Sequence, residues 1–336
     1  MNHTAKSDLP VAAVDLGGTK IAVGIISPEY RVIARGHHPT LANEGAEAVI
    51  NRVISAVKQV SESQGISLTG LAGISIAAAG AIDSRKGLIT ISPNLPGWQN
   101  IPLGKIVSER LGVNTWLIND ANSAALAEYQ LGAGQGISNL IYISVGTGIG
   151  GAIIINGNLY TGACGSAGEI GHMTIENNGP KCGCGNIGCL EMLASGAAMA
   201  REALRRIANG EKSSLTNIAA RNPAHITGKE IEAAARAGDV LAGDVIHDAA
   251  IYLGVGMVNM INIFNPEMII VGGGVARMGE LLLVPARQVV KERAIPLSAG
   301  AVRIVPSKLG NDAGLLGAAC FAYRKTLMEV KDNESP

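Results

Sequence analysis

The chain has 336 residues, of which 47% are hydrophobic and 16% charged, and its 27 basic side chains are balanced by 27 acidic ones. This length predicts two domains, and the zero net charge excludes a global basic field for holding nucleic acid. The polar segment Met1–Asp8 lacks the apolar core of a signal peptide, and the longest apolar stretch, Leu71–Ile82, is too short to cross a bilayer. We therefore expect a cytoplasmic protein that binds neither membrane nor nucleic acid.

Two apolar strands near the N-terminus enclose a glycine-rich turn. The predicted strands are Pro10–Val14 and Ile21–Ile26, and Asp15-Leu16-Gly17-Gly18-Thr19-Lys20 lies between them. Because the second strand begins almost at once, the pattern predicts a β-hairpin. Backbone N–H groups in such a turn bind phosphate oxygens, since glycine lacks the Cβ that would keep a ligand away. Asp15 is a candidate to hold Mg²⁺ through its water shell; an ordinary tight hairpin is the alternative.

The next segments alternate between helix and strand. Apolar residues at helical spacing predict a helix over about 45–63, and Leu71–Ile76 is a predicted buried strand. A strand at Thr115–Ile118 then leads through Asn119-Asp120 into a helix from about Ala121 to Tyr129. Ligands of open α/β sheets collect at the carboxyl ends of the strands, so this pair stands where a ligand is expected. Helix capping is the alternative role, because Asn and Asp are favoured N-caps.

A second hairpin repeats the first about 130 residues later. Its predicted strands are Leu140–Ser144 and Ala152–Ile155, joined by Val145-Gly146-Thr147-Gly148-Ile149-Gly150-Gly151. The join matches the Gly-x-Gly-x-x-Gly dinucleotide pattern, but that pattern requires a helix at its third glycine, and here a β-branched strand follows. The first turn, Gly17-Gly18-Thr19-Lys20, is not a Walker-A loop either, because it lacks the first glycine of that pattern. The two turns together predict a duplicated phosphate-binding hairpin.

One histidine and three cysteines have the spacing of metal ligands. They are His172, Cys182, Cys184 and Cys189, spaced H-x9-C-x-C-x4-C and interleaved with glycines. Such a set completes a tetrahedral zinc shell with no position left for water; buried thiols beside an unrelated histidine are the alternative. Cys164 and Cys320 stand apart, and an odd number of cysteines argues against a disulfide framework. The cluster predicts a structural zinc that contributes to folding and performs no chemistry.

The remaining sequence is mostly helical. A long apolar helix is predicted around Asp244–Ile263, and a strand at Glu267–Val271 runs into Gly272-Gly273-Gly274 before another helix. A glycine run between a strand and a helix is either a ligand-binding loop or a plain tight connection. Strands mixed with helices throughout the chain predict the α/β class.

These motifs together resemble the ROK family of sugar kinases, within the actin-like (ribonuclease-H-like) ATPase superfamily. The resemblance covers nearly the whole chain and is most specific at Gly168-Glu169-Ile170-Gly171-His172 and at Cys182–Glu191. It implies a two-domain actin-like α/β fold with duplicated β-hairpin/α-helix units and a central cleft. We expect a smaller domain over residues 1–118, rejoined by about 311–336, and a larger domain over 119–310 that carries the zinc loop.

The resemblance also implies a set of site residues. Asp120 is implied as the base that accepts the proton of a sugar 6-hydroxyl as it attacks the γ-phosphate of Mg·ATP. The implied sugar ligands are Asn94, Asn119, Asp120, Glu169, His172 and Glu191. The implied nucleotide-binding residues are Asp15, Gly17, Gly18, Thr19, Lys20, Gly146, Thr147, Gly148, Gly314 and, as an adenosine-side loop, Gly272, Gly273 and Gly274. His172 would give one ring nitrogen to zinc and the other to the sugar, so that the zinc fixes the loop carrying Glu169 and Glu191.

The identity of the sugar rests on two loops. The run Asn94-Leu95-Pro96-Gly97-Trp98 is similar to that of ROK glucokinases and favours glucose. Where many family members carry a Gly-Pro pair, this chain has Ala77-Ala78-Ala79-Gly80, which leaves N-acetylmannosamine, N-acetylglucosamine and fructose open. The resemblance leaves the phosphoryl donor open between ATP and polyphosphate, and it implies a homo-oligomer, either a dimer or a tetramer.

Two further classes of protein are alternatives. A sugar-sensing repressor of the same family would carry a helix-turn-helix domain, and only nine residues precede the first predicted strand. A non-catalytic sugar-binding protein is disfavoured because Asp15, Asp120 and both phosphate turns are present.

Overall fold

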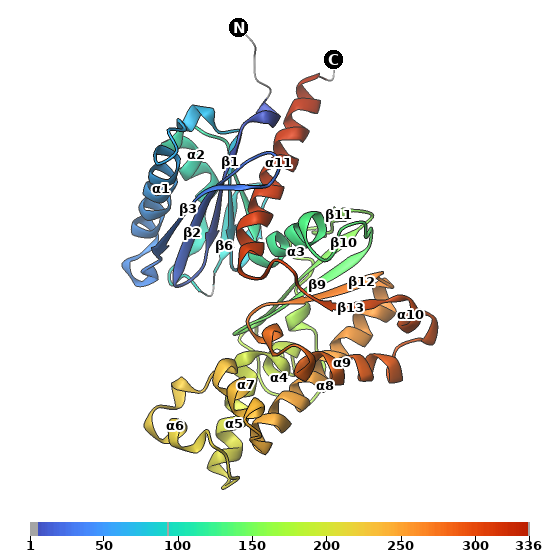
Figure 1. The fold of residues 1–336 in the computed structure, drawn as a ribbon. Coiled ribbons are helices and arrows are strands. Elements are labelled where there is room, and N and C mark those ends of the chain that lie inside the picture. Colours follow the sequence, from blue (N-terminus) through green and yellow to red (C-terminus); the bar gives the residue numbers. More distant parts are fainter. Residues whose placement is uncertain (1–5, 93, 335–336) are drawn as a thin grey trace. The chain divides into compact units, whose positions relative to one another are not determined.

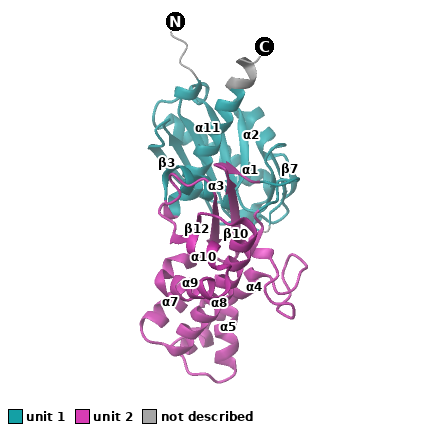
Figure 2. Cartoon of the chain, turned by 90° about the vertical axis from the view of Figure 1, so that its right-hand side faces the viewer, with its two compact units in different colours: residues 1–132, 161–167, 311–336 teal, residues 133–160, 168–310 magenta. Residues whose placement is uncertain are grey.

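The structure is a computed structural model that describes residues 6–92 and 94–334. The chain forms two compact units, which Figure 2 colours separately. Unit 1 consists of residues 1–132, 161–167 and 311–336, and unit 2 of residues 133–160 and 168–310. The first boundary falls at residue 132, where the sequence suggested 118, because helix α3 (Asp120–Leu131) packs against helix α11 (Ala313–Glu334) within unit 1.

Unit 1 is built on a five-stranded sheet in the order β3-β2-β1-β4-β8. The strands are β1 (Val11–Leu16), β2 (Lys20–Ile26), β3 (Val32–Pro39), β4 (Gly73–Ala78) and β8 (Thr115–Asn119). Strand β1 pairs antiparallel with β2 and parallel with β4, and β4 pairs parallel with β8. The predicted N-terminal hairpin is confirmed.

Helices cover both faces of this sheet (Figure 1). One face packs against α1 (Ala46–Glu62) and α2 (Leu103–Leu111), because α1 turns an apolar stripe with Val49, Val53 and Val57 toward the sheet. Helices α11 and α3 cover the opposite face. A methyl group on Gly317 of α11 would lie 1.7 Å from the backbone oxygen of Ser123, so the two helices cross at a distance that only glycine allows.

A small three-stranded sheet in unit 1 was not predicted. It comprises β5 (Ala81–Asp83), β6 (Leu88–Ile91) and β7 (Gln99–Ile101). The loop between β6 and β7 carries Asn94, and the buried side chains of Leu95 and Trp98 anchor it.

Unit 2 repeats the strand order, as β11-β10-β9-β12-β13. The strands are β9 (Leu140–Val145), β10 (Ile149–Ile155), β11 (Asn158–Leu159), β12 (Met268–Gly272) and β13 (Arg303–Pro306). Strand β9 pairs antiparallel with β10 and parallel with β12, which pairs parallel with β13. This pattern matches unit 1 and confirms the predicted duplication of the hairpin.

The second hairpin turn is shorter than predicted. It comprises only Gly146–Gly148, and the sequence wrongly placed Gly150 and Gly151 in the loop, since both lie within β10. A methyl group on Gly151 would lie 2.3 Å from the side chain of Ile170. These glycines therefore make room for a packed segment. No helix begins at the third glycine, which confirms that this is not a dinucleotide-binding turn.

Helices form the rest of unit 2. They are α4 (Leu190–Ala194), α5 (Gly196–Ala208), α6 (Thr216–Arg221), α7 (Gly228–Arg236), α8 (Val240–Phe264), α9 (Glu280–Arg293) and α10 (Pro296–Ala301). By length and composition α8 is apolar enough to cross a membrane. Its residues Leu253, Met257 and Ile261 are nevertheless buried in the core of unit 2 together with Ile143 and Val271 of the sheet, so α8 is a core helix.

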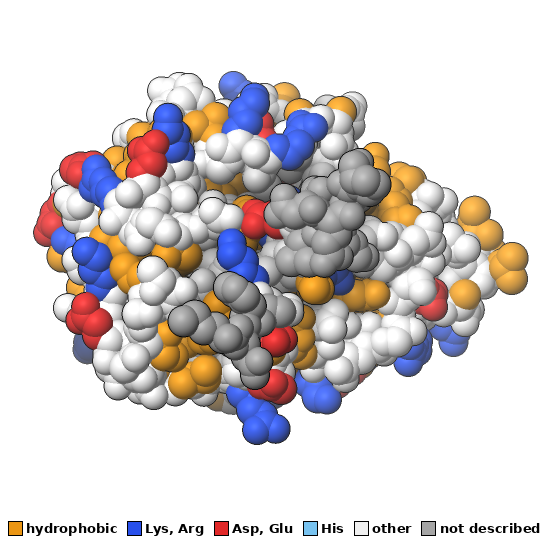
Figure 3. Space-filling model, turned by 90° about the horizontal axis from the view of Figure 1, so that it is seen from above, with side chains coloured by type: hydrophobic (Ala, Val, Ile, Leu, Met, Phe, Trp, Pro, Cys, Tyr) orange, Lys and Arg blue, Asp and Glu red, His pale blue; other side chains and the backbone are white. Residues whose placement is uncertain are grey.

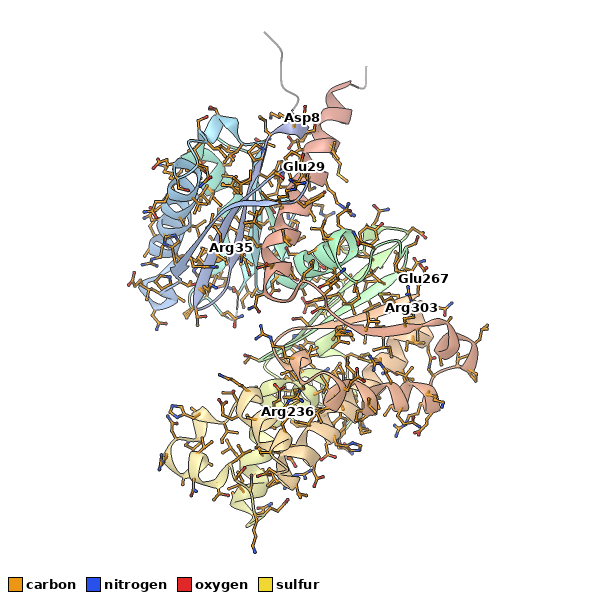
Figure 4. The ribbon with its side chains drawn as sticks, viewed as in Figure 1. Asp8, Glu29, Arg35, Arg236, Glu267 and Arg303 are labelled. Atoms are coloured by element: carbon orange, nitrogen blue, oxygen red, sulfur yellow. The ribbon has the colours of Figure 1, made fainter. Side chains whose placement is uncertain are left out.

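Short 3₁₀ helices join many of these elements. They are Lys6–Asp8, Ala42–Glu44, Leu68–Gly70, Ile170–His172, Pro223–His225, Val275–Met278 and Gly310–Asp312. Glu267, which precedes β12, accepts hydrogen bonds from the N–H groups of Ser138 and Asn139 at 3.0 and 2.8 Å (Figure 4). These bonds tie the start of β12 to the start of β9.

Charges of opposite sign are interspersed on the surface. On the face shown in Figure 3, lysine and arginine side chains lie among aspartates and glutamates. Arg35 of β3, labelled in Figure 4, pairs with Asp312 at 2.9 Å, and Arg110 pairs with Glu47 at 2.8 Å. The mixture agrees with the balanced composition.

Candidate active site

The carboxyl ends of three parallel strands meet at one edge of the unit 1 sheet. In the strand register Leu16 lies opposite Ala78, and Ala78 lies opposite Asn119. The Gly17–Thr19 turn follows the first of these strands and Asp120 follows the third. The predicted nucleotide turn and the predicted base therefore share the edge at which open α/β sheets bind their ligands.

The Gly17–Thr19 turn is held by its carbonyl groups. Thr40, which is fully buried, donates its hydroxyl to the oxygen of Gly17 at 2.6 Å and its N–H to the oxygen of Thr19 at 2.9 Å. Among the described residues, the N–H groups of Gly18 and Thr19 have no hydrogen-bond acceptor. Two unused donors in a glycine turn are a ready site for phosphate oxygens. Sequence reasoning missed Thr40, since a lone threonine after a strand carries no signal of this role.

Asp15 lies beside this turn and against the start of α11. A methyl group on Gly314 would lie 2.7 Å from its Oδ2, so the glycine makes room for the carboxylate. Burial raises the pKa of Asp15, and the nearby charge of Lys20 opposes that shift. An incompletely compensated carboxylate of this kind is stabilised in its charged form by a divalent cation. The side chain of Lys20 is exposed.

The loop that carries Asn94 packs against the first turn. A methyl group on Gly18 would lie 2.8 Å from the backbone oxygen of Asn94 and 3.1 Å from its Cβ. Glycine is therefore required here for close approach of two segments. The structure thus brings one predicted nucleotide residue into contact with one predicted sugar ligand, and Asn94 itself is exposed.

Asn119 is the N-cap of α3, and Asp120 is the first residue of the helix. The Oδ1 of Asn119 accepts hydrogen bonds from the N–H groups of Ala121 and Asn122 at 3.0 and 3.1 Å, and its Nδ2 donates to the oxygen of Gly80 at 3.1 Å. Asn119 therefore caps the helix. The Oδ1 of Asp120 also accepts the N–H of Ala121 at 2.8 Å, and this side chain is exposed at the strand end. With both acceptor positions of Oδ1 in use, Asn119 has only the second hydrogen of Nδ2 for a sugar.

In unit 2 the Gly146–Gly148 turn is held in the same manner. The N–H groups of Gly196 and Ala197, at the start of α5, donate to the oxygens of Gly146 and Thr147 at 2.8 and 3.3 Å. Within the described part of the chain, the N–H groups of Thr147 and Gly148 donate to no group. The exposed Thr147 adds a hydroxyl to these two donors. Both hairpins therefore offer the same pair of unused N–H groups.

The Gly272–Gly274 run lies beside this second turn. Gly272 pairs with Ser144 in the parallel register of β12 and β9. Gly273 has a φ of 88°, and a methyl group on it would lie 2.4 Å from the oxygen of Val145. Only glycine fits this position. The predicted phosphate turn and the predicted adenosine-side loop therefore share one edge of the unit 2 sheet.

Glu169, His172 and Glu191 lie near the start of β10. A methyl group on Gly171 would lie 2.0 Å from the oxygen of Ile149, so the segment from 169 to 172 packs directly on this strand. The Oε2 of Glu191 accepts a hydrogen bond from the N–H of Ile149 at 2.9 Å. Glu169 is exposed, and the other two residues are half-buried.

Four potential metal ligands converge in the same region. The ligand atoms of His172, Cys182, Cys184 and Cys189 lie within 4.8 Å of one another. The Nδ1 of His172 is 3.6 Å from the Sγ of Cys182, and the Sγ atoms of Cys184 and Cys189 are 3.7 Å apart. Zinc bonds of about 2.0–2.3 Å place the ligand atoms of a tetrahedron about 3.3–3.8 Å apart, so the group fits zinc. The Nε2 of His172 is left for another partner.

Electrostatics and backbone geometry also fit a cation in this cluster. Burial and the two neighbouring thiols raise the pKa of Cys189 to about 12. A bound cation favours the thiolate and so lowers this pKa again. Gly188 has a φ of 66°, and a methyl group on it would lie 1.6 Å from the oxygen of Glu176. The loop can therefore fold back on itself only with glycine at this position.

Comparison with known proteins identifies the family. The model of the protein family described as "ROK family" matches residues 11–325 of this chain. The chain belongs to the ROK family. It is 38% identical over 314 residues to the glucokinase of Thermotoga maritima, covering 93% of this chain and 96% of that protein. It is 34% identical over 312 residues to the xylose repressor of Caldicellulosiruptor bescii, covering 93% of this chain and 77% of the repressor.

A solved structure of a ROK protein has the same fold. The ROK family glucokinase of Streptomyces griseus, in complex with glucose and AMPPNP, superimposes with a TM-score of 0.80 at 37% identity, covering 94% of this chain and 99% of that one. The predicted ROK resemblance and the predicted actin-like α/β fold are thus confirmed. The roles of individual site residues stay predictions.

Proposed function

We propose that this ROK protein transfers the γ-phosphate of Mg·ATP to the 6-hydroxyl of a hexose, and that the hexose is glucose. The observation that carries the proposal is the repeated glycine turn. In each copy the carbonyl groups of the turn accept hydrogen bonds from a neighbouring segment, and two N–H groups stay unused. The same fold exposes Asp120 at a strand end. The glucokinase names of relatives at 37–38% identity support the choice of reaction and of sugar.

Each group of residues has a distinct task in the proposed reaction. The unused N–H groups of the two turns bind phosphate oxygens, which stabilises the charge of the transferring group. Asp15 would hold Mg²⁺, and the ion would offset the charge of the phosphate oxygens. Asp120 accepts the proton of the 6-hydroxyl, and a positioned base of this kind contributes about 10²- to 10⁴-fold to the rate. Asn94, Asn119, Glu169, His172 and Glu191 supply the donors and acceptors that hold the sugar hydroxyl groups.

We also propose one structural zinc per chain, held by the His172–Cys189 cluster defined above. The ligand spacing supports it, and a closed shell of one nitrogen and three sulfurs leaves no position for water. The ion would fix the segment from 169 to 191 and so orient the sugar-binding side chains. A cytoplasmic location is proposed from the same cluster, since a reducing compartment keeps thiols free to bind metal. Self-association and the absence of nucleic acid binding stay predictions.

Sugar-stimulated ADP release from Mg·ATP tests the proposal. We expect glucose to give the highest kcat/KM among glucose, N-acetylmannosamine, N-acetylglucosamine, mannose and fructose. A higher value for another sugar would retain the kinase activity and change the preferred substrate. The Ala77–Gly80 loop would then be the first candidate for that preference; Ser92 and Asn119 donate to its oxygens at Ala79 and Gly80. No release with any sugar, with either ATP or polyphosphate as donor, would contradict the proposed function.

A further inference from the structure

One acidic side chain links the zinc loop to the phosphate turn of unit 2. Glu191 lies in α4, two residues after Cys189 of the metal cluster. Its Oε2 accepts the N–H of Ile149, the residue directly after the Gly146–Gly148 turn, at 2.9 Å. Among the described residues, its other oxygen accepts no hydrogen bond.

The turn is shaped around this carboxylate. A methyl group on Gly148 would lie 2.3 Å from the Oε2 of Glu191 and 3.2 Å from its carboxyl carbon. The carboxylate therefore fills the position next to Gly148 that a side chain would otherwise take. A negative charge beside a phosphate-binding turn repels phosphate. A hydrogen bond that fixes the turn in its binding geometry offsets this repulsion.

Three hydrogen bonds join the segment from 191 to 197 to the turn and its first following residue. Glu191 accepts from Ile149, and the N–H groups of Gly196 and Ala197 donate to the turn oxygens at 2.8 and 3.3 Å. The bond of Glu191 is the only one of the three made by a side chain. The N–H of Gly148 lies in the same peptide plane as the oxygen of Thr147, which Ala197 holds, and the N–H of Ile149 lies in the next plane. The bond of Glu191 therefore fixes the other side of Gly148.

We propose that Glu191 is a positioning residue for the nucleotide: its hydrogen bond to Ile149 holds the Gly146–Gly148 turn in the conformation that binds phosphate. The inference rests on the proposed function, and it assigns to Glu191 a role on the nucleotide side of the reaction. It predicts that nucleotide affinity depends on this bond even when no sugar is present.

A crossed pair of conservative variants separates the bond from the charge. Glu191→Gln keeps an oxygen at the same reach and removes the charge, whereas Glu191→Asp keeps the charge and is one methylene too short to reach Ile149. Glu176→Asp, an exposed acid of the zinc loop outside the proposed site, is the matched control. The dissociation constant of Mg·ADP is measured by calorimetry without sugar, and the thermal midpoint of each variant is recorded.

Glu191→Asp is expected to weaken Mg·ADP binding by about tenfold to a hundredfold, the range of one charge-assisted hydrogen bond. Glu191→Gln and the control are expected to bind Mg·ADP within about threefold of the wild type. Equal affinity in all variants would overturn the inference, as would a loss in Glu191→Gln equal to that in Glu191→Asp. A lower thermal midpoint with unchanged Mg·ADP affinity would assign Glu191 a purely structural role. A wild type that neither binds Mg·ADP nor phosphorylates any sugar would contradict the proposed function instead.

Discussion

Two glycines of one turn provide a test of how tightly the site is packed. Neither Gly146 nor Gly148 has a positive φ, so alanine introduces no backbone strain at either position. A methyl group on Gly146 would meet nothing within 4 Å, whereas one on Gly148 would lie 2.3 Å from the Oε2 of Glu191. Gly148→Ala should therefore displace the carboxylate and break its bond to Ile149, and Gly146→Ala should not.

The magnitude follows from the broken bond. A hydrogen bond to a charged group contributes about 1.5–3 kcal/mol, and the N–H of the buried Ile149 would lose its partner. Each alanine also stabilises the protein by lowering the conformational entropy of the unfolded chain, and this effect is equal in the two variants and cancels. At about 2–4 °C per kcal/mol for a domain of this size, Gly148→Ala should melt about 3–12 °C below Gly146→Ala.

Thermal unfolding without ligands measures this difference, and urea unfolding checks it at constant temperature. Equal midpoints for the two variants would show that Glu191 moves aside without loss, and the packing argument for the turn would then be wrong. A lower midpoint for Gly146→Ala would refute it more directly.

Three further predictions concern the base, the metal and a helix cap. Asp120→Asn should lower kcat by about 10²- to 10⁴-fold with sugar affinity nearly unchanged; retained turnover would remove Asp120 as the base. Elemental analysis should find about one zinc per chain, and an active, folded, metal-free preparation would contradict the structural zinc. Asp239 is half-buried, which opposes ionisation, but hydrogen bonds from Ala242 and from Ser214 lower its pKa to about 2. Asp239→Ala should cost about 1 kcal/mol of stability at pH 7. Because the folded pKa lies below the usual value of about 3.9, this cost should vanish as the pH falls from about 5 to about 2; a constant cost in urea unfolding would contradict it.

Features that depend on local pattern were predictable from the sequence. Both hairpins show as apolar runs around a glycine turn, and the long helix α8 shows by its predominantly apolar sequence. The metal cluster is predictable because three of its four ligands lie within eight residues, at Cys182, Cys184 and Cys189. Each of these signals is contained in a short stretch of chain.

Features that depend on contacts between distant residues were not predictable. The length of the second turn was wrong because Gly151 is required by Ile170, a contact that no local pattern reveals. Thr40 and Gly196 hold the two turns by N–H groups that donate to backbone oxygens, and any residue with an N–H group can make such a bond. The hydroxyl bond of Thr40 to Gly17 joins residues far apart in the chain, which no local pattern reveals. The short strands β6 and β7 carry mixed polar and apolar residues, so their pairing depends on the loop that Trp98 anchors.

The repeated strand order has a consequence for how alike the two copies are. Asp15 is the next-to-last residue of β1, and the equivalent position of β9 is Ser144. One copy of the scaffold therefore carries a negative charge where the other carries a neutral hydroxyl. At this strand position only the copy with Asp15 can attract a cation, and the negative charge beside the second turn comes instead from Glu191 of α4. The two copies are thus not interchangeable: an aspartate at 144 would add a charge that repels phosphate, and a serine at 15 would remove the attraction for the metal.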